Sequence, residues 1–328
     1  MVTAQLGGMR HAAGTVGSVL ADLGVRLGYG AGTGLTTVQQ VRDEAAWANA
    51  AGFESFWVSQ VFGVDPIVAL AAVGEAAPDL RELGTSVVPI AGRHPLALAA
   101  QARTAQSALD GRFTLGVGTS HQMVVEGFFG ESYERPFSRA SEFLDALIPL
   151  LEGRPTDFVG EQVFAKGWLS IESEPCSVLL AALGPRMLEL AGRTTAGTSV
   201  GSCGPQTIAN HIAPVITEAA DRAGRPPPRI VALVGVCVTD DPAGLREHGR
   251  QQSVMYDNFP SYRKMLDREG VESGADLTLT GSFDEIAEGL STYAQAGATD
   301  LRIMIGGRND DERAATRSAI VDALAPPS

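Results

Sequence analysis

Short apolar, β-branched segments alternate along the chain with longer segments in which apolar residues recur at helical spacing. The clearest strand is the valine-rich segment Arg229 to Val238. Prolines and capping residues, such as Thr37 and Pro66, begin the helical segments. The pattern predicts eight strands, at residues 25–29, 55–58, 83–90, 113–118, 177–182, 198–200, 229–238 and 300–305. It predicts helices at residues 37–51, from 66 onward, and at 95–109, 137–151, 185–191, 205–223, 242–269, 282–296 and 310–324.

Strands that are apolar on both faces and separated by helices favour an α/β fold with a parallel sheet, closed as a (β/α)8 TIM barrel. The rival is a doubly wound open sheet, which needs a phosphate turn near its N-terminus. Residues 28–34 do not match the GxGxxG pattern of that turn. We therefore predict one barrel domain over residues 24–328, with a small insertion at about 153–176 after the fourth β/α unit. Residues 1–22 are predicted to be a flexible extension.

The chain has 328 residues and a formal net charge of −13, without a run of basic residues, which argues against nucleic-acid binding. No apolar stretch approaches the roughly 18–20 residues of a membrane span. The three cysteines lie far apart, without metal-ligand or CxxC spacing, as in a cytoplasmic protein that holds no metal. These properties leave a small molecule as the expected binding partner.

In a parallel barrel, ligands bind at the C-terminal ends of the strands. Gly118, Thr119 and Ser120 form a small-residue turn at one such end. The next predicted strand is followed by Gly184, Pro185 and Arg186, where free helix N–H groups and a positive charge could hold a phosphate. Arg186 could equally be an ordinary solvent-facing arginine. A second small-residue turn could share that phosphate and contains Gly201 and Ser202.

Two further positions suggest chemistry. Ser86 and Val87 precede Pro89, which lacks the N–H of a regular central strand, so a β-bulge is predicted there. His121 follows the Gly118 turn and could act as an acid or base, or simply pack.

Four ordered segments together resemble the luciferase-like monooxygenase superfamily, and within it the oxidoreductases that use the deazaflavin coenzyme F420. They begin LGTSVVPIAG, GRFTLGVGTSH, AALGPRMLEL and TLTGSFDEIA. The resemblance implies a (β/α)8 barrel with a cofactor ring against a non-proline cis peptide at Ser86-Val87. Residues 118–120 would line the cofactor, and residues 184–186 would hold its phosphate.

The chain departs from the sugar-phosphate dehydrogenase branch of that family, which has an Asp-His pair and a glutamate at its catalytic positions. Here those positions hold Gln60-Val61 and His121. We therefore predict Gln60 and His121 as catalytic residues, but not for the oxidation of a sugar hydroxyl. The resemblance implies hydride transfer between deazaflavin C5 and an unidentified organic substrate, with a homodimer left open. Two alternatives stay open: an FMN-dependent monooxygenase served by a separate reductase, and a non-catalytic flavin or deazaflavin carrier.

Overall fold

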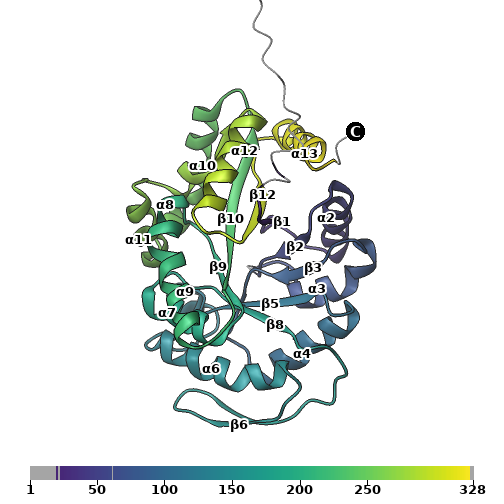
Figure 1. Ribbon diagram of the computed structural model, residues 1–328, viewed down its shortest axis with the longest axis vertical. Helices are drawn as coiled ribbons and strands as arrows, with labels where there is room; N and C mark the ends of the chain where they lie inside the picture. The colour runs from purple at the N-terminus through teal and green to yellow at the C-terminus, as the bar shows by residue number, and fades with distance from the viewer. Residues whose placement is uncertain (1–19, 21–22, 61, 326–328) are drawn as a thin grey trace, which may run out of the picture.

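The computed structural model describes residue 20 and residues 23–60 and 62–325 of the chain. Within them, eight parallel strands close into a barrel in the order β10-β12-β1-β2-β3-β5-β8-β9, with β9 pairing back to β10. The helices form a ring around these strands (Figure 1). The predicted (β/α)8 barrel is confirmed. Its strands are β1 Arg26–Gly30, β2 Ser55–Val58, β3 Glu82–Thr85, β5 Phe113–Gly118, β8 Ser177–Leu180, β9 Gly197–Val200, β10 Arg229–Val238 and β12 Asp300–Ile305.

The predicted helical segments form in the predicted order, and the short helix at Gln122–Gly127 was not predicted. Those of the first half are α2 Val38–Ala51, α3 Pro66–Val73, α4 Pro95–Ala108, α5 Gln122–Gly127, α6 Pro136–Leu151 and α7 Pro185–Thr194. Those of the second half are α8 Pro205–Thr207, α9 Ala213–Arg222, α10 Pro242–Asp257, α11 Pro260–Glu269, α12 Phe283–Gln295 and α13 Asp310–Leu324. None of the described helices is long and apolar enough to cross a membrane.

Two predicted helices are divided. The segment predicted at 242–269 breaks between Asp257 and Pro260, because Pro260 has no backbone N–H to continue α10 and instead begins α11. The segment predicted at 205–223 passes from α8 through a five-residue π-helix, Ile208–Ile212, into α9. Continuous helices were therefore wrong at both places.

Four short strands are not part of the eight-stranded barrel. The predicted strand 83–90 is divided into β3 and a two-residue strand β4, Val88–Pro89. A short strand β11, Leu279–Gly281, pairs with the end of β10. In the predicted insertion, β6 Thr156–Val159 and β7 Phe164–Gly167 form an antiparallel hairpin outside the ring of helices (Figure 1).

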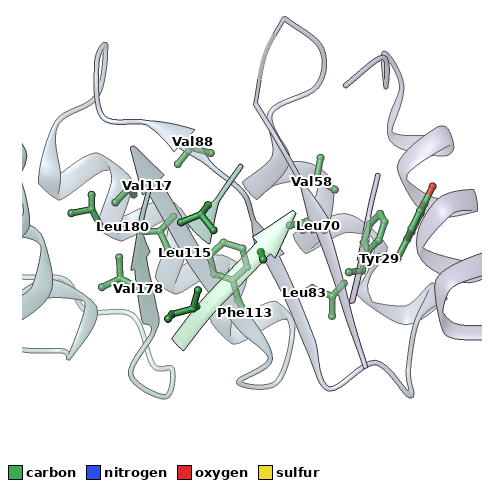
Figure 2. Close-up of a cluster of buried hydrophobic side chains, with 14 of the residues drawn as sticks. Tyr29, Val58, Leu70, Leu83, Val88, Phe113, Leu115, Val117, Val178 and Leu180 are labelled. Atoms are coloured by element: carbon green, nitrogen blue, oxygen red, sulfur yellow. The ribbon is translucent and has the colours of Figure 1, made fainter. Parts of the chain in front are cut away.

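The main core lies between the barrel strands and the helices. Leu83, Leu115 and Leu180 come from three neighbouring strands and are almost completely buried there, together with Leu70 of α3 (Figure 2). Leu20 also belongs to this core. The other residues of the extension predicted at 1–22 lie outside the described residues.

The middle of the barrel interior is filled mainly by one large side chain. The indole of Trp57 occupies the space that a Cβ would need at Gly84, and its Nε1 atom lies 2.9 Å from a Cβ built at Gly28. Trp57 donates a hydrogen bond from Nε1 to Ser55 Oγ at 2.8 Å. Leu179 and Val231 pack against the same side chain. The barrel is therefore a packed core at this level, and ligands can approach only from its ends.

The N-terminal end of the interior is closed by charged side chains. Arg26, Glu82, Arg229 and Asp300 are the first residues of their strands. Arg229 donates to Glu82 through Nη1 at 2.7 Å and Nη2 at 2.8 Å, and to Asp300 through Nη2 at 2.7 Å. Arg26 lies 2.8 Å from Asp300. Every charge in this basal ion cluster, as we name these four residues, has an opposite charge beside it.

Candidate functional site

The opposite end of the barrel interior, the barrel mouth, is organised around the backbone carbonyl of Ser86. This oxygen accepts hydrogen bonds from Ser59 Oγ at the end of β2 and from Arg302 Nη1 at 2.9 Å. The Ser86 hydroxyl lies 2.8 Å from the hydroxyl of Ser199 on β9. The chain between β3 and β4 is thus tied to three other strands.

Arg302 projects from β12 across the interior toward the mouth. It is accommodated because Gly30, on the adjacent strand, has no side chain: a Cβ there would lie 2.9 Å from Arg302 Cγ. Arg302 is only 6% exposed. It forms no ion pair within the described part of the chain, and its buried Nε has no hydrogen-bond partner there. Burial lowers its pKa to about 10, so it is still protonated at neutral pH.

Aromatic side chains gather at the mouth. The imidazole of His121 stacks on the ring of Phe259, with centroids 3.9 Å apart and planes 13° from parallel. The ring of Tyr262 meets His121 edge-on at 5.1 Å. Burial lowers the pKa of His121 and raises that of Tyr262 to about 12, so both side chains are neutral at pH 7. Phe259 and Tyr262 belong to the start of α11, which lies beside α8 and α10 in the ring (Figure 1).

Two of the predicted cofactor segments touch each other. Val87 packs over two glycines of β5: its Cγ1 and Cγ2 atoms lie 3.0 Å from Cβ atoms built at Gly116 and Gly118. The peptide bond between Ser86 and Val87 is cis, as the resemblance implied. Val87 and Gly118 therefore form one surface at the mouth. We call it the Val87 shelf.

The turn after the Val87 shelf is held by Tyr133. Its hydroxyl donates to the carbonyl of Ser120 at 2.9 Å and lies 3.4 Å from Thr119 Oγ1. Ser120 has a φ of +61°, in the left-handed region that is uncommon for residues other than glycine. Tyr133 therefore contacts the turn at the residue with this unusual backbone conformation.

The N-terminus of α7 is open. Among the described residues, no side chain caps it, and none of their atoms lies within 4 Å of a Cβ built at Gly184. Arg186 is exposed and places its guanidinium carbon 4.1 Å from the ring centroid of Phe137. Free N–H groups, open space and a guanidinium side chain are the features of an anion site at a helix start.

The turn at Gly201 and Ser202 differs. Ser202 also has a positive φ, +54°, but the helix start behind it is already filled. Glu269 accepts hydrogen bonds from the backbone N–H groups of Gln206 and Thr207, at 3.2 and 2.7 Å. A phosphate shared with the Gly184 turn would therefore have to use Gly201 and Ser202 themselves.

The pattern of the luciferase-like monooxygenase family matches residues 16–300. The chain belongs to this family. A putative coenzyme F420-dependent oxidoreductase of Mycobacterium tuberculosis is 28% identical over 299 residues, 81% of this chain and 84% of that protein. The F420-dependent glucose-6-phosphate dehydrogenase of Mycolicibacterium smegmatis is 29% identical over 307 residues, which cover 84% of this chain and 91% of that enzyme. Both matches span the greater part of either chain.

The barrel also matches a solved structure, that of the coenzyme F420-dependent tetrahydromethanopterin reductase from Methanopyrus kandleri. The TM-score is 0.75 at 18% identity, over 92% of this chain and 97% of that one. This likeness shows the fold. Together with family membership, the relatives make this protein an oxidoreductase of the luciferase-like class.

The two residues predicted as catalytic in this luciferase-like protein are not joined by a hydrogen bond in the described structure. Gln60 Oε1 accepts from Arg93 Nη2 at 2.7 Å, and that same nitrogen lies 2.9 Å from Asp65. Gln60 nevertheless belongs to the mouth, because its backbone N–H donates to the carbonyl of Val87 at 3.3 Å. Catalysis by Gln60 or His121 stays a prediction.

Sequence reasoning missed several residues of the mouth. Arg302 had a usable signal, a lone charge inside the apolar strand segment Leu301 to Ile305. Phe259 and Tyr262 had none, because their segment was read as the middle of a long helix. Tyr133 and Ser199 are an ordinary aromatic and an ordinary small residue whose contacts arise only when the barrel closes.

Proposed function

We propose that this protein is a coenzyme F420-dependent oxidoreductase that transfers hydride between C5 of the deazaflavin and a small organic substrate. The observation that carries the proposal is the similarity, over more than four fifths of the chain, to proteins named as F420-dependent enzymes. A cytoplasmic location goes with this proposal, and the three free, buried cysteines support it.

The barrel mouth fits such a cofactor. The Val87 shelf offers an apolar surface of branched side chain over glycine, suited to a flat ring. The open start of α7 at Gly184, Pro185 and Arg186 suits a phosphate. When bound, the deazaflavin supplies or accepts the hydride, and the protein contributes binding, orientation and proton transfer.

His121 is the side chain best suited to move a proton here. Its neutral imidazole carries one N–H donor and one free acceptor nitrogen, and the stacked Phe259 holds the ring in place. The Asp-His pair and the glutamate of the sugar-phosphate branch are replaced by Gln60-Val61 and His121. We therefore propose a substrate other than a sugar phosphate for this protein.

The alternative is an FMN-dependent monooxygenase that takes reduced flavin from a partner reductase. This alternative is favoured by the family of this chain, which is described as luciferase-like monooxygenases. The two functions differ in the cofactor, because a reduced flavin reacts with oxygen, whereas a reduced deazaflavin, which has carbon in place of flavin N5, would transfer hydride instead.

A titration separates these functions. The purified protein is titrated with F420 and, separately, with FMN, and binding is followed by the change in cofactor fluorescence. We expect saturable binding of F420 at least about tenfold tighter than that of FMN, a difference of about 1.4 kcal/mol. Tight FMN binding without measurable F420 binding would overturn the proposal in favour of the monooxygenase.

A further inference from the structure

We propose that Arg302 is the group that recognises the substrate, and that the substrate carries a carboxylate on a flat apolar body. This inference rests on the proposed function, because it assigns the substrate class of the same barrel mouth. It concerns a residue that was not predicted to bind the cofactor, although it donates to the Ser86 carbonyl beside the Val87 shelf.

The first observation is the unsatisfied donor capacity of Arg302. A guanidinium has five N–H donors, and one hydrogen bond is formed here, from Nη1 to the Ser86 carbonyl at 2.9 Å. The Nε group is buried without a partner in the described structure. A buried polar group that is left without a partner is costly, and a buried charge more so. A ligand that accepts from this guanidinium removes that cost.

A second buried arginine shows that burial alone does not leave a guanidinium without hydrogen-bond partners. Arg103 is also only 6% exposed and also forms no ion pair within the described residues. Its three nitrogens are nevertheless all satisfied: Nε and Nη2 donate to Ser173, at 3.0 and 3.1 Å, and Nη1 donates to the carbonyl of Leu150. Arg103 is a structural arginine. Arg302, in contrast, lacks within the described residues the acceptor oxygens that would satisfy its Nε group.

The groups around Arg302 favour an anionic ligand. The hydroxyls of Ser86 and Ser199 hydrogen-bond to each other, and the carbonyl of Ser86 is already shared with Ser59. Tyr262 is the titratable group that acts electrostatically on Arg302, and it is neutral at pH 7. In the described structure, no carboxylate approaches within ion-pair distance of Arg302. No carboxylate of the described residues therefore compensates the positive charge at the floor of the mouth.

The shape of the site favours a carboxylate over a phosphate. The planar fork of an arginine matches the two oxygens of a carboxylate, and aromatic rings prefer flat apolar partners. Tyr262 joins the two features, because it acts on Arg302 and its ring meets the stacked pair of His121 and Phe259. A carboxylate bound at Arg302 would place the rest of its molecule beside these rings.

The test uses the full-length protein without cofactor. Benzoate is the probe, benzamide is its neutral counterpart, and inorganic phosphate is a non-planar anion. Binding is measured by calorimetry and by the shift in melting temperature. We expect benzoate to bind at least tenfold more tightly than either benzamide or phosphate. Equal binding of benzoate and benzamide, or tighter binding of phosphate, overturns the proposal.

Substitutions of Arg302 test whether benzoate binds at this residue. Arg302→Met should weaken benzoate binding about ten- to a hundredfold, the loss expected for charge-assisted hydrogen bonds. Arg302→Lys keeps the positive charge but not the planar fork of the guanidinium, so it should lose less benzoate affinity than Arg302→Met. It replaces Arg302→Met in the test if that variant fails to fold. Arg42→Met, on the outer helix α2, is the control and should bind benzoate like the wild type. Unchanged benzoate affinity in both Arg302 variants overturns the proposal.

An F420 titration of the same variants separates substrate from cofactor. We expect F420 affinity in the Arg302 variants to stay within about threefold of the wild type. A loss of tenfold or more would mean that Arg302 holds the cofactor, and would overturn the substrate assignment. If the wild type binds benzoate through Arg302 but does not bind F420, the proposed function fails while the carboxylate site stands.

Discussion

The two ends of the barrel interior each contain an arginine, largely buried at the N-terminal end and buried at the mouth, and the two arginines have opposite surroundings. At the N-terminal end, Arg229 contacts two carboxylates, those of Glu82 and Asp300. Burial alone would lower its pKa, but the hydrogen bonds and charges of Glu82 and Asp300 outweigh burial and hold the pKa above its ordinary value. At the mouth, Arg302 has no carboxylate partner in the described structure, and burial lowers its pKa.

This difference separates charges that stabilise the fold from charges that are available to a ligand. A buried ion pair that loses one partner destabilises the folded state, because the other charge stays buried without compensation. An arginine that already lacks a partner contributes little to stability when it is removed. Substitutions at the two ends should therefore change different measurements: stability at the closed end, and ligand affinity at the mouth.

The largest effect is expected at the basal ion cluster. Glu82→Gln removes the charge that receives two hydrogen bonds from Arg229 and one from Thr114. The free energy of unfolding, measured by urea denaturation, should fall by about 3 kcal/mol. Glu54→Gln is the control, because its pair with Arg81 is exposed and should contribute less than about 1 kcal/mol. Equal effects of the two substitutions would remove the distinction between a buried cluster and a surface pair.

The next effect concerns cofactor affinity. Arg186→Ala should weaken F420 binding by about 1.5–3 kcal/mol, the range of hydrogen bonds to charged groups, and leave the free energy of unfolding without cofactor almost unchanged. The measurement is the F420 titration, with urea denaturation beside it. Arg193→Ala, at the other end of α7, is the matched control and should leave F420 affinity unchanged. Intact affinity in Arg186→Ala would leave Arg186 as a surface arginine stacked on Phe137.

A smaller effect, of opposite sign, is expected at Arg302. Arg302→Met removes one hydrogen bond to Ser86 but also relieves a buried charge, so the free energy of unfolding should rise by roughly 1 kcal/mol. The comparison is made without ligand, in parallel with Glu82→Gln. A fall of more than about 2 kcal/mol would assign Arg302 to the structure instead, and the two ends of the barrel would then be alike.

The smallest effect is a pH dependence from His121. Because burial lowers its pKa in the folded protein, the unfolded chain binds the proton more strongly. The stability that neutral His121 contributes is present above the unfolded pKa of about 6.5, and it is lost as the pH falls from there through the folded pKa. Wild type should therefore lose more stability between about pH 7.5 and pH 5.5 than His121→Phe, which keeps an aromatic ring against Phe259. Identical losses in urea denaturation would show that His121 titrates normally.

The fold could be predicted because its signals are local. Strands such as Arg229–Val238 are apolar on both faces, and prolines such as Pro66, Pro185 and Pro242 stand at the first turns of helices. The same reasoning failed where a local signal was overlooked, since Pro260 ends the run of helix that begins at Pro242. It also could not foresee the π-helix at Ile208–Ile212.

Part of the candidate site was also visible in the sequence. The glycine turn at Gly118, the irregular segment at Ser86-Val87 and the open helix start at Gly184 all lie at strand ends, as predicted. Their positions along the chain were sufficient to place them together at one end of the barrel, because all the parallel strands of a barrel end at the same face.

The sequence by itself determined the barrel, the end at which ligands bind, and the small-residue turns at that end, since each depends on periodicity and composition over short stretches. Only the tertiary structure decided which buried charges have partners. Arg302 meets the carbonyl of Ser86 across 216 positions of the chain, and Glu82 meets Arg229 across 147. Such contacts depend on how the barrel closes and on the space left by Gly30, and no local pattern of residues encodes that geometry.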